Sequence, residues 1–213
     1  MNAVIKPLDI ESLDLSPKAK KLIHRLKSPD LIQKHLNSLP FNFEKKGETY
    51  MSPKRSMESS KIHCFEGALL AAVVLWAQGE RPLILDLKTT KDDIDHVVTL
   101  FKRDGYWGAI SKTNHAMLRY RDAVYKTPRE LVMSYFHEYF LNNGEKTLRS
   151  FSKPFDLSKY GMDWIVTEDN LYHLVSDLDH SPHEDILSND QIKTLRKADP
   201  IERKAGSMTE WKD

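Results

Sequence analysis

The apolar run CFEGALLAAVVLWAQG, at positions 64–79, restricts the fold more than any other part of this sequence. Its apolar residues between Ala68 and Trp76 cover most of the circumference of a helix, and such a helix must be buried on nearly all sides. Gly79 fits the position that ends the helix. We therefore predict a central buried helix over residues 63–78, with the rest of the chain packed around it.

The flanking segments predict an α+β fold. Short helices are expected in SPKAKKLIHRLKS and SPDLIQKHLNSL, because proline favours the first helical position after a serine cap. An amphipathic helix is expected over TPRELVMSYFHEYF, positions 127–140. RPLILDLK predicts a strand, and the apolar segments on either side of Asp104-Gly105 predict a hairpin. The central helix should pack on this small antiparallel sheet.

The chain is expected to form one domain over residues 16–180. Residues 1–15 alternate between acidic and apolar side chains, and we expect a flexible N-terminus there. From Ser181 to the end, the sequence is polar and rich in charge, which predicts a mobile C-terminal tail.

Charge and cysteine content exclude several classes of protein. The 32 basic and 31 acidic residues leave a formal net charge of +1. That balance gives no long-range field that would gather nucleic acid or an anionic membrane, so we expect neither as a partner. A single cysteine cannot form an internal disulfide. No apolar stretch reaches the length of a signal peptide or a membrane span, and we expect a cytoplasmic protein.

The single cysteine, Cys64, stands at the opening turn of the predicted central helix. Free backbone amides and the helix dipole favour an anion there, so the position suits a thiolate nucleophile. The alternative is that Cys64 is a small buried apolar residue, as most lone cysteines are. A thiol nucleophile also needs a base that returns a proton to the leaving group. His96, at the start of the predicted hairpin, is the candidate for this role.

The order of these parts resembles the transglutaminase-like cysteine enzymes, a superfamily that includes peptidases, amidases and acyl transferases. The matching pieces are HCFEGALLAAVVLWAQG, DHVVTLF and GYWGAISKT, and the resemblance covers roughly residues 61–114. It implies a papain-related fold, with Cys64 as the nucleophile and His96 as the base and then the acid. Trp107 falls on the family's tryptophan and would form a wall of the cleft. No metal or organic cofactor is needed for such a reaction.

This sequence departs from the family pattern at the third catalytic position, where Ser111 replaces an aspartate. The third residue fixes the imidazole tautomer and stabilises the imidazolium. Ser111 can accept a hydrogen bond from the ring but carries no charge. Asn114 is the second candidate, since papain-like enzymes use asparagine in this role. The backbone N–H of Cys64 is the natural donor to an oxyanion.

The resulting prediction is thiol-dependent acyl chemistry, either hydrolysis or transfer, on a peptide, amide, ester or other acyl substrate. Arg119 and Arg121 are candidates for binding a substrate carboxylate or phosphate, and salt bridges with local acids are the alternative for both. Two other functions stay open. One is a binding module, with a protein or other partner, on a scaffold that has lost the chemistry. The other is a metal-dependent hydrolase that uses the histidines and carboxylates of residues 173–184.

Overall fold

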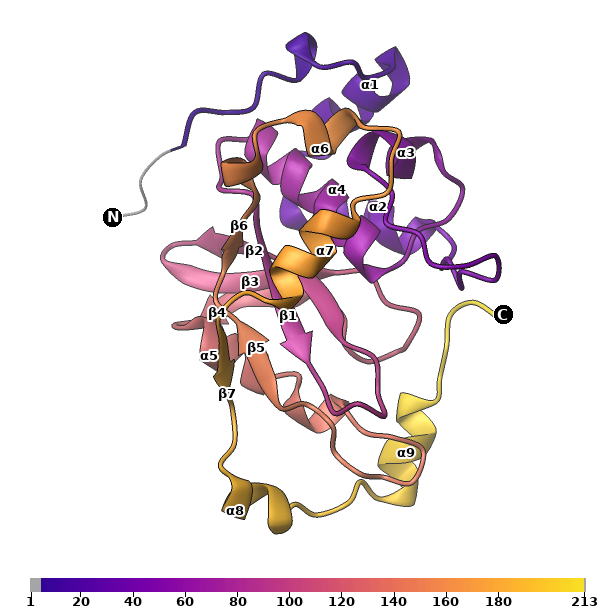
Figure 1. Ribbon diagram of the computed structural model, residues 1–213, viewed down its shortest axis with the longest axis vertical. Coiled ribbons are helices and arrows are strands. Elements are labelled where there is room, and N and C mark those ends of the chain that lie inside the picture. The colour runs from indigo at the N-terminus through magenta and orange to yellow at the C-terminus, as the bar shows by residue number, and fades with distance from the viewer. Residues whose placement is uncertain (1–4, 213) are drawn as a thin grey trace.

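The computed structural model describes residues 5–212 and has an α+β fold, in which helices pack against a seven-stranded antiparallel sheet (Figure 1). The strand order is β4-β3-β2-β1-β5-β7, and β6 also pairs with β1. The strands are β1 (Leu83–Lys88), β2 (His96–Arg103), β3 (Tyr106–Ser111), β4 (Arg121–Tyr125), β5 (Ser150–Ser152), β6 (Phe155–Asp156) and β7 (His183–Asp185). The predicted first strand and the hairpin around Asp104-Gly105 are thereby confirmed.

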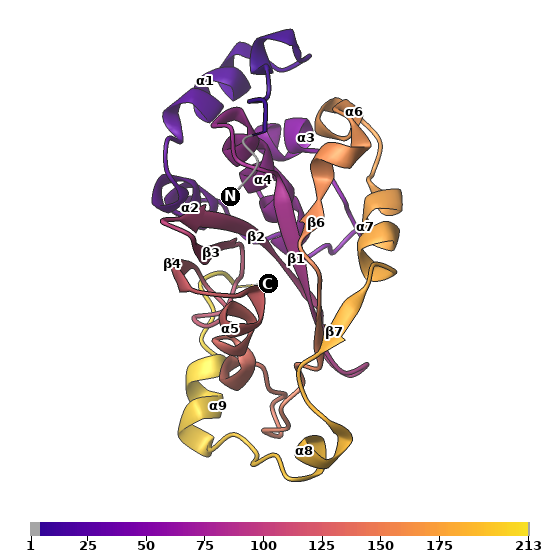
Figure 2. The same ribbon diagram turned by 90° about the vertical axis from the view of Figure 1, so that its left-hand side faces the viewer.

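Helices gather at both ends of the sheet. Towards one end lie α1 (Pro17–Arg25), α2 (Pro29–Ser38), α3 (Pro53–Glu58), α4 (Cys64–Ala77), α6 (Asp163–Val166) and α7 (Tyr172–Asp179). Towards the other end lie α5 (Pro128–Met133), α8 (Asn189–Lys193) and α9 (Pro200–Gly206), as Figure 2 shows. Short 3-10 helices cover Ile10–Ser12, Phe136–Glu138 and Leu157–Tyr160.

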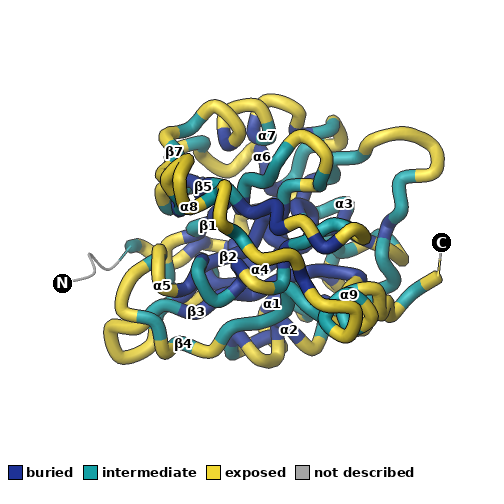
Figure 3. Tube along the Cα trace, turned by 90° about the horizontal axis from the view of Figure 1, so that it is seen from below, coloured by how far each residue is buried: buried dark blue, intermediate teal, exposed yellow. Residues whose placement is uncertain are grey.

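The central helix α4 is the core of the molecule, as its sequence predicts. Every residue from Phe65 to Trp76 is buried. It packs on the sheet face that carries Val97 and Ile110, and the Thr99 hydroxyl of β2 donates a hydrogen bond of 2.7 Å to the carbonyl of Ala68. The opposite face of the sheet packs against α5. Figure 3 shows the buried parts of the chain running through the interior, around α4 and the central strands.

The segment predicted as a flexible N-terminus packs against the core where the structure describes it. Leu8, Ile10, Leu13 and Leu15 are buried, and the Leu8 amide donates to the Trp76 carbonyl at 3.1 Å. The acidic residues between these four apolar residues face solvent, which explains why the alternating pattern suggested disorder. Residues 1–4 lie outside the described part of the chain.

The segment from Ser181 onward carries regular structure instead of the predicted mobile tail. β7 pairs with β5, and α9 follows a backbone hydrogen bond of 2.8 Å from Ala198 N to Gly144 O. A second bond, from Ala116 N to Met208 O at 2.9 Å, attaches the chain after α9. The segment is held largely through backbone groups and ion pairs, so its polar composition does not indicate its order.

The helix predicted over residues 127–140 is shorter in the structure. It begins at Pro128 with the Thr127 hydroxyl as its cap, and it ends at Met133. Ser134 marks the end because its hydroxyl donates to the Leu131 carbonyl at 2.6 Å, and Arg121 donates to the carbonyl of Ser134 itself. Side-chain donors of this kind satisfy the free carbonyls of a helix end.

Candidate active site

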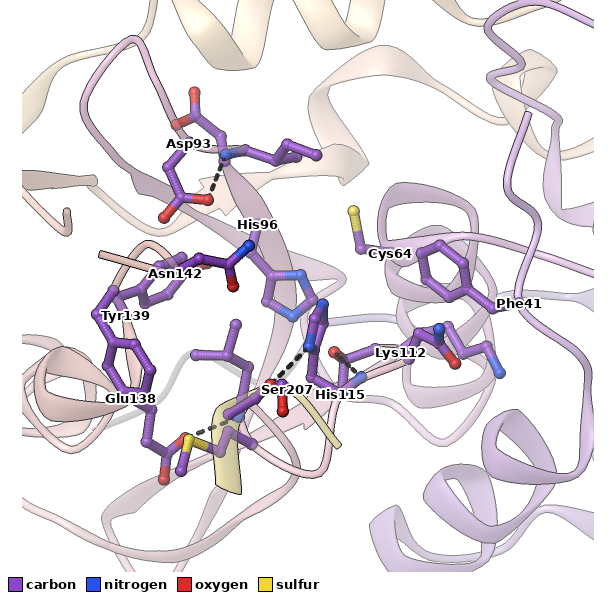
Figure 4. A pocket seen from close by; sticks show the side chains of 18 of the residues that line it. Phe41, Cys64, Asp93, His96, Lys112, His115, Glu138, Tyr139, Asn142 and Ser207 are labelled. Carbon is purple, nitrogen blue, oxygen red and sulfur yellow. Dashed lines mark hydrogen bonds between the residues drawn. The ribbon is translucent and has the colours of Figure 1, made fainter. Parts of the chain in front are cut away.

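Cys64, His96 and Ser111 meet at the junction of α4 with the sheet. Cys64 is the first residue of α4 and is half-buried, His96 is the first residue of β2, and Ser111 is the last residue of β3. Cys64 and His96 line a cavity of about 380 Å³. Figure 4 shows the Cys64 side chain near the His96 ring in this cavity. The helix start and the hairpin therefore bring a thiol and an imidazole together, as the sequence order predicts.

Ser111 holds the ring of His96. The His96 Nε2 atom lies 2.8 Å from the Ser111 Oγ atom, and the Ser111 hydroxyl donates at 2.5 Å to the carbonyl of Leu118. Because the hydroxyl proton is engaged with that carbonyl, Nε2 of the ring must be the donor to Ser111. The Nδ1 atom is then left for the thiol. Gln33 of α2 fixes Ser111 in turn, since its side-chain amide bonds both the N–H and the carbonyl of Ser111, at 2.9 Å and 2.7 Å.

The second candidate for this role, Asn114, is engaged elsewhere. Its side-chain N–H donates to the Trp211 carbonyl at 3.0 Å, and its side-chain oxygen accepts from the Trp211 amide at 2.8 Å. Asn114 lines the cavity, but its side-chain amide is hydrogen-bonded to the backbone of the C-terminal segment. Ser111 is therefore the residue of the two that is hydrogen-bonded to His96.

The thiol of Cys64 is acidic in this setting. Burial alone would raise its pKa, but hydrogen bonds and positive charge from His63 and His96 outweigh burial and lower the pKa of Cys64 to about 5. An unperturbed thiol has a pKa near 8.5. The group is therefore a thiolate at neutral pH, which is the nucleophilic form.

A second histidine, His63, directly precedes Cys64 and was not predicted from the sequence as a site residue. Its Nδ1 atom lies 4.0 Å from the Cys64 sulfur, and its Nε2 atom lies 2.6 Å from the Thr49 carbonyl and 3.4 Å from a carboxylate oxygen of Glu66. Burial acts to lower the pKa of His63, but hydrogen bonds to Cys64 and Glu66 raise it to about 11. The signal for this pair was the spacing His63-x-x-Glu66 at a helix start, since the Glu66 carboxylate accepts from the His63 N–H at 3.0 Å.

The remaining wall of the cavity combines aromatic, polar and charged residues and reaches into the C-terminal segment. Tyr139 is buried, and its hydroxyl has no hydrogen-bond partner within residues 5–212. A buried hydroxyl without a partner is uncommon in a folded protein, and the oxygen of Tyr139 is covered by the surrounding residues. The other lining residues include Phe41, Phe43, Asp93, Asp95, Lys112, Phe140, Arg203 and Ser207.

The predicted role of Trp107 as a wall of the cleft does not fit its position. Trp107 pairs with Lys102 near the turn of the hairpin, whereas His96 lies at the far end of β2. Six residues of strand separate the two positions, or about 20 Å. The Lys102 ammonium covers the Trp107 ring, at 4.1 Å from its centroid. Trp107 is therefore not among the residues that line the cavity.

Arg119 and Arg121 form ion pairs with acids later in the chain and do not line the cavity either. The Arg119 guanidinium lies 2.9 Å from Glu210, and that of Arg121 lies 2.7 Å from Glu138. Arg121 also stacks on the ring of Tyr135, at 4.1 Å from its centroid. Both arginines connect the region after β3 to later parts of the chain, and their partners are Glu210 and Glu138 in place of the local acids expected from the sequence.

The histidines and carboxylates of residues 173–184 do not converge on one point. Within the described residues, the grouping with metal-ligand spacing is Asp86, Asp95 and Asp179, which takes only one member from that segment. Asp179 is already paired with the Lys88 ammonium at 2.5 Å, and His183 lies 3.2 Å from Asp86. The metal-dependent alternative has no ligand set here that is free of internal partners.

Comparison of the chain with protein-family models and with curated proteins found no match to either. Among residues 5–212, no helix has the length and apolar character required to cross a bilayer.

Proposed function

We propose that this protein catalyses acyl chemistry through a thiolate, either hydrolysis of an amide or ester or transfer of the acyl group to another acceptor. The observation that carries the proposal is the hydrogen bond of 2.8 Å from His96 to Ser111, which leaves the other ring nitrogen for Cys64. A thiol and an imidazole in one cavity, with the ring held in a single tautomer, match the requirements of nucleophilic catalysis.

The reaction would run in two halves. The Cys64 thiolate attacks the carbonyl carbon of the substrate and forms a carbon–sulfur bond, and the carbonyl electrons move to oxygen. The tetrahedral intermediate collapses, and protonated His96 gives its proton to the departing amine or alcohol. Neutral His96 then takes a proton from water or an amine, which attacks the thioester and releases the thiolate. The reaction needs no oxidant or reductant.

Two donors suit the oxygen atoms of such a substrate. The backbone N–H of Cys64 is in the first turn of α4, where amides have no carbonyl partner within the helix. A backbone amide in this position is typical of an oxyanion hole. The Tyr139 hydroxyl is a separate donor for a more distant part of the substrate, and its use requires a movement of the side chains that cover its oxygen.

The fold we propose for this chain is transglutaminase-like and papain-related. Support comes from the helix that begins at Cys64 and packs on β2, the strand that begins at His96. The chain departs from that pattern at Ser111 and in the position of Trp107. These departures bear on how the base is stabilised and on what lines the cleft, and they leave the Cys64–His96 pair unchanged.

The test is the detection of a covalent acyl-enzyme. The chain is incubated with an activated aryl ester such as p-nitrophenyl acetate, and intact mass is measured during turnover. We expect a single acyl adduct that maps to Cys64 and is lost by hydrolysis once the ester is consumed. Cys64→Ala should abolish the adduct, and His96→Ala should slow both its formation and its loss. A folded wild-type protein that forms no adduct with aryl esters or with a panel of amides would favour the binding-module alternative.

A further inference from the structure

The His63 ring contacts both the Cys64 sulfur and a buried carboxylate, that of Glu66. Glu66 is fully buried, and it accepts hydrogen bonds from the His63 N–H at 3.0 Å, the Thr49 hydroxyl at 2.9 Å and the Met51 N–H at 3.2 Å. Three donors of this kind hold it as a carboxylate. A buried charge is normally kept only when a charge of opposite sign accompanies it.

His63 is the cation that accompanies this carboxylate. Its ring is buried, and its Nε2 atom lies 3.4 Å from Glu66 and 3.7 Å from Glu44. The same atom lies 2.6 Å from the Thr49 carbonyl, so it must carry a proton. The Nδ1 atom faces the Cys64 sulfur at 4.0 Å. With Glu66 and a thiolate on its two sides, the ring is favoured as an imidazolium.

We propose that His63 and Glu66 form a fixed imidazolium–carboxylate pair that keeps Cys64 ionised, while His96 is left to move the protons. Both are positioning residues, since they act on the reaction through the sulfur. The role of His96 as the proton carrier depends on the proposed function. The role of His63 in keeping Cys64 as a thiolate does not depend on the proposed function, because it is a property of the free protein.

This arrangement accounts for the serine at position 111. In a cysteine–histidine–aspartate site, the carboxylate behind the base stabilises the imidazolium and so favours the ion pair. Here the carboxylate is Glu66, and its effect reaches the sulfur through a different imidazole. His96 hydrogen-bonds to the uncharged Ser111, so no carboxylate at that position opposes its deprotonation.

Several charged groups act on the same thiol and set its titration. His63 precedes it in the chain, and His96 approaches from β2, and both favour the thiolate. Asp93 and Asp95, from the loop before β2, also line the cavity, and negative charge near a thiol acts against the thiolate. Lys112 lines the cavity as well, but its ammonium is bonded to the carbonyls of Leu36 and Leu39. Removal of His63 leaves all of these other groups in place.

The experiment is a pH titration of the thiol in the free protein, followed by absorbance at 240 nm. With a single cysteine in the chain, the signal reports Cys64 alone. The variants are His63→Gln and Glu66→Gln. His115→Gln is the matched control, because His115 lines the same cavity but its Nδ1 atom bonds to the Gly206 carbonyl at 3.0 Å. Circular dichroism and urea unfolding establish that each variant is folded.

An opposite charge within about 4 to 6 Å shifts a pKa by one to three units. We therefore expect His63→Gln to lower the thiolate fraction at acidic pH by about 10- to 1,000-fold, with a smaller change in the same direction for Glu66→Gln. His115→Gln should leave the titration unchanged. If Glu66→Gln fails to fold, the His63→Gln and His63→Asn variants decide the outcome. Folded His63 variants that titrate like the wild type would overturn the proposal, whatever the result of the acyl-enzyme test.

Discussion

The replacement Ser111→Ala tests how His96 is held, because it removes one oxygen atom that bonds both the buried His96 ring and the half-buried Leu118 backbone. The His96 N–H loses its acceptor at 2.8 Å, and the Leu118 carbonyl loses its donor at 2.5 Å. A buried polar group left without a partner costs about 1 to 3 kcal/mol. Allowing for local relaxation, we expect a loss of about 2 to 4 kcal/mol in the free energy of unfolding.

The same replacement should slow the acyl chemistry. A single neutral hydrogen bond contributes about 1 to 1.5 kcal/mol, and each 1.4 kcal/mol corresponds to a factor of ten in rate. We therefore expect the first-order rate of acyl-enzyme formation to fall about tenfold at saturating ester. The assay is the release of p-nitrophenol in the burst phase, measured by stopped flow at a temperature where the variant is fully folded.

The control for this prediction is Asn114→Ala. That variant removes the two hydrogen bonds to Trp211 and loosens the C-terminal segment, but it leaves the His96–Ser111 contact in place. We expect a weaker apparent affinity for the ester with an almost unchanged limiting rate. A limiting rate that falls in Asn114→Ala and holds in Ser111→Ala would refute this description of the base.

Three further variants probe the packing and the charges around the site. Gly67→Ala should destabilise the protein by about 1 to 2 kcal/mol in urea unfolding, because a methyl group at that position would lie 2.6 Å from the Lys112 Cβ atom, and a more stable variant would contradict this. Tyr139→Phe should weaken ester or amide binding several-fold without a loss of fold, since the hydroxyl has no partner within residues 5–212; an unchanged affinity across substrates would remove it from the binding site. Cys64→Ala should lose a stabilising contribution that grows with pH. The folded thiol has a pKa of about 5, below the usual value near 8.5, so the contribution is complete above about 8.5 and is lost as the pH falls towards 5. A wild-type-minus-variant difference in unfolding free energy that is flat over this interval would show that the thiol is not ionised in the fold.

Much of the fold and the main pair of the site follow from the sequence. The run from Phe65 to Trp76 is apolar on all sides, so it has no alternative to burial in a helix. The Asp104-Gly105 turn fixes the register of the hairpin, and the register places His96 and Ser111 at one end of it. These are local patterns, which a sequence displays directly.

Several contacts around the site join distant segments, and the sequence does not display them. Trp107 matches the family's tryptophan in order, but the strand register places it far from His96. Asn114 meets Trp211 across 97 positions, through backbone groups that have no signature in composition. The charge of Glu66 looks like an interruption of an apolar run. Its spacing from His63 is a local signal of a helix start, but the bonds of both residues to Thr49 come from a separate loop.

The Cys64 sulfur is expected to be an anion at neutral pH, stabilised by the neighbouring imidazoles. The most direct measurement is the rate of alkylation by iodoacetamide between pH 4 and 9, followed by intact mass, in the folded protein and again in urea. We expect the alkylation rate to have its midpoint near pH 5 in the folded protein and near pH 8.5 in the unfolded chain. A folded protein whose thiol alkylates with the midpoint of the unfolded chain, or does not alkylate at all, would contradict this expectation.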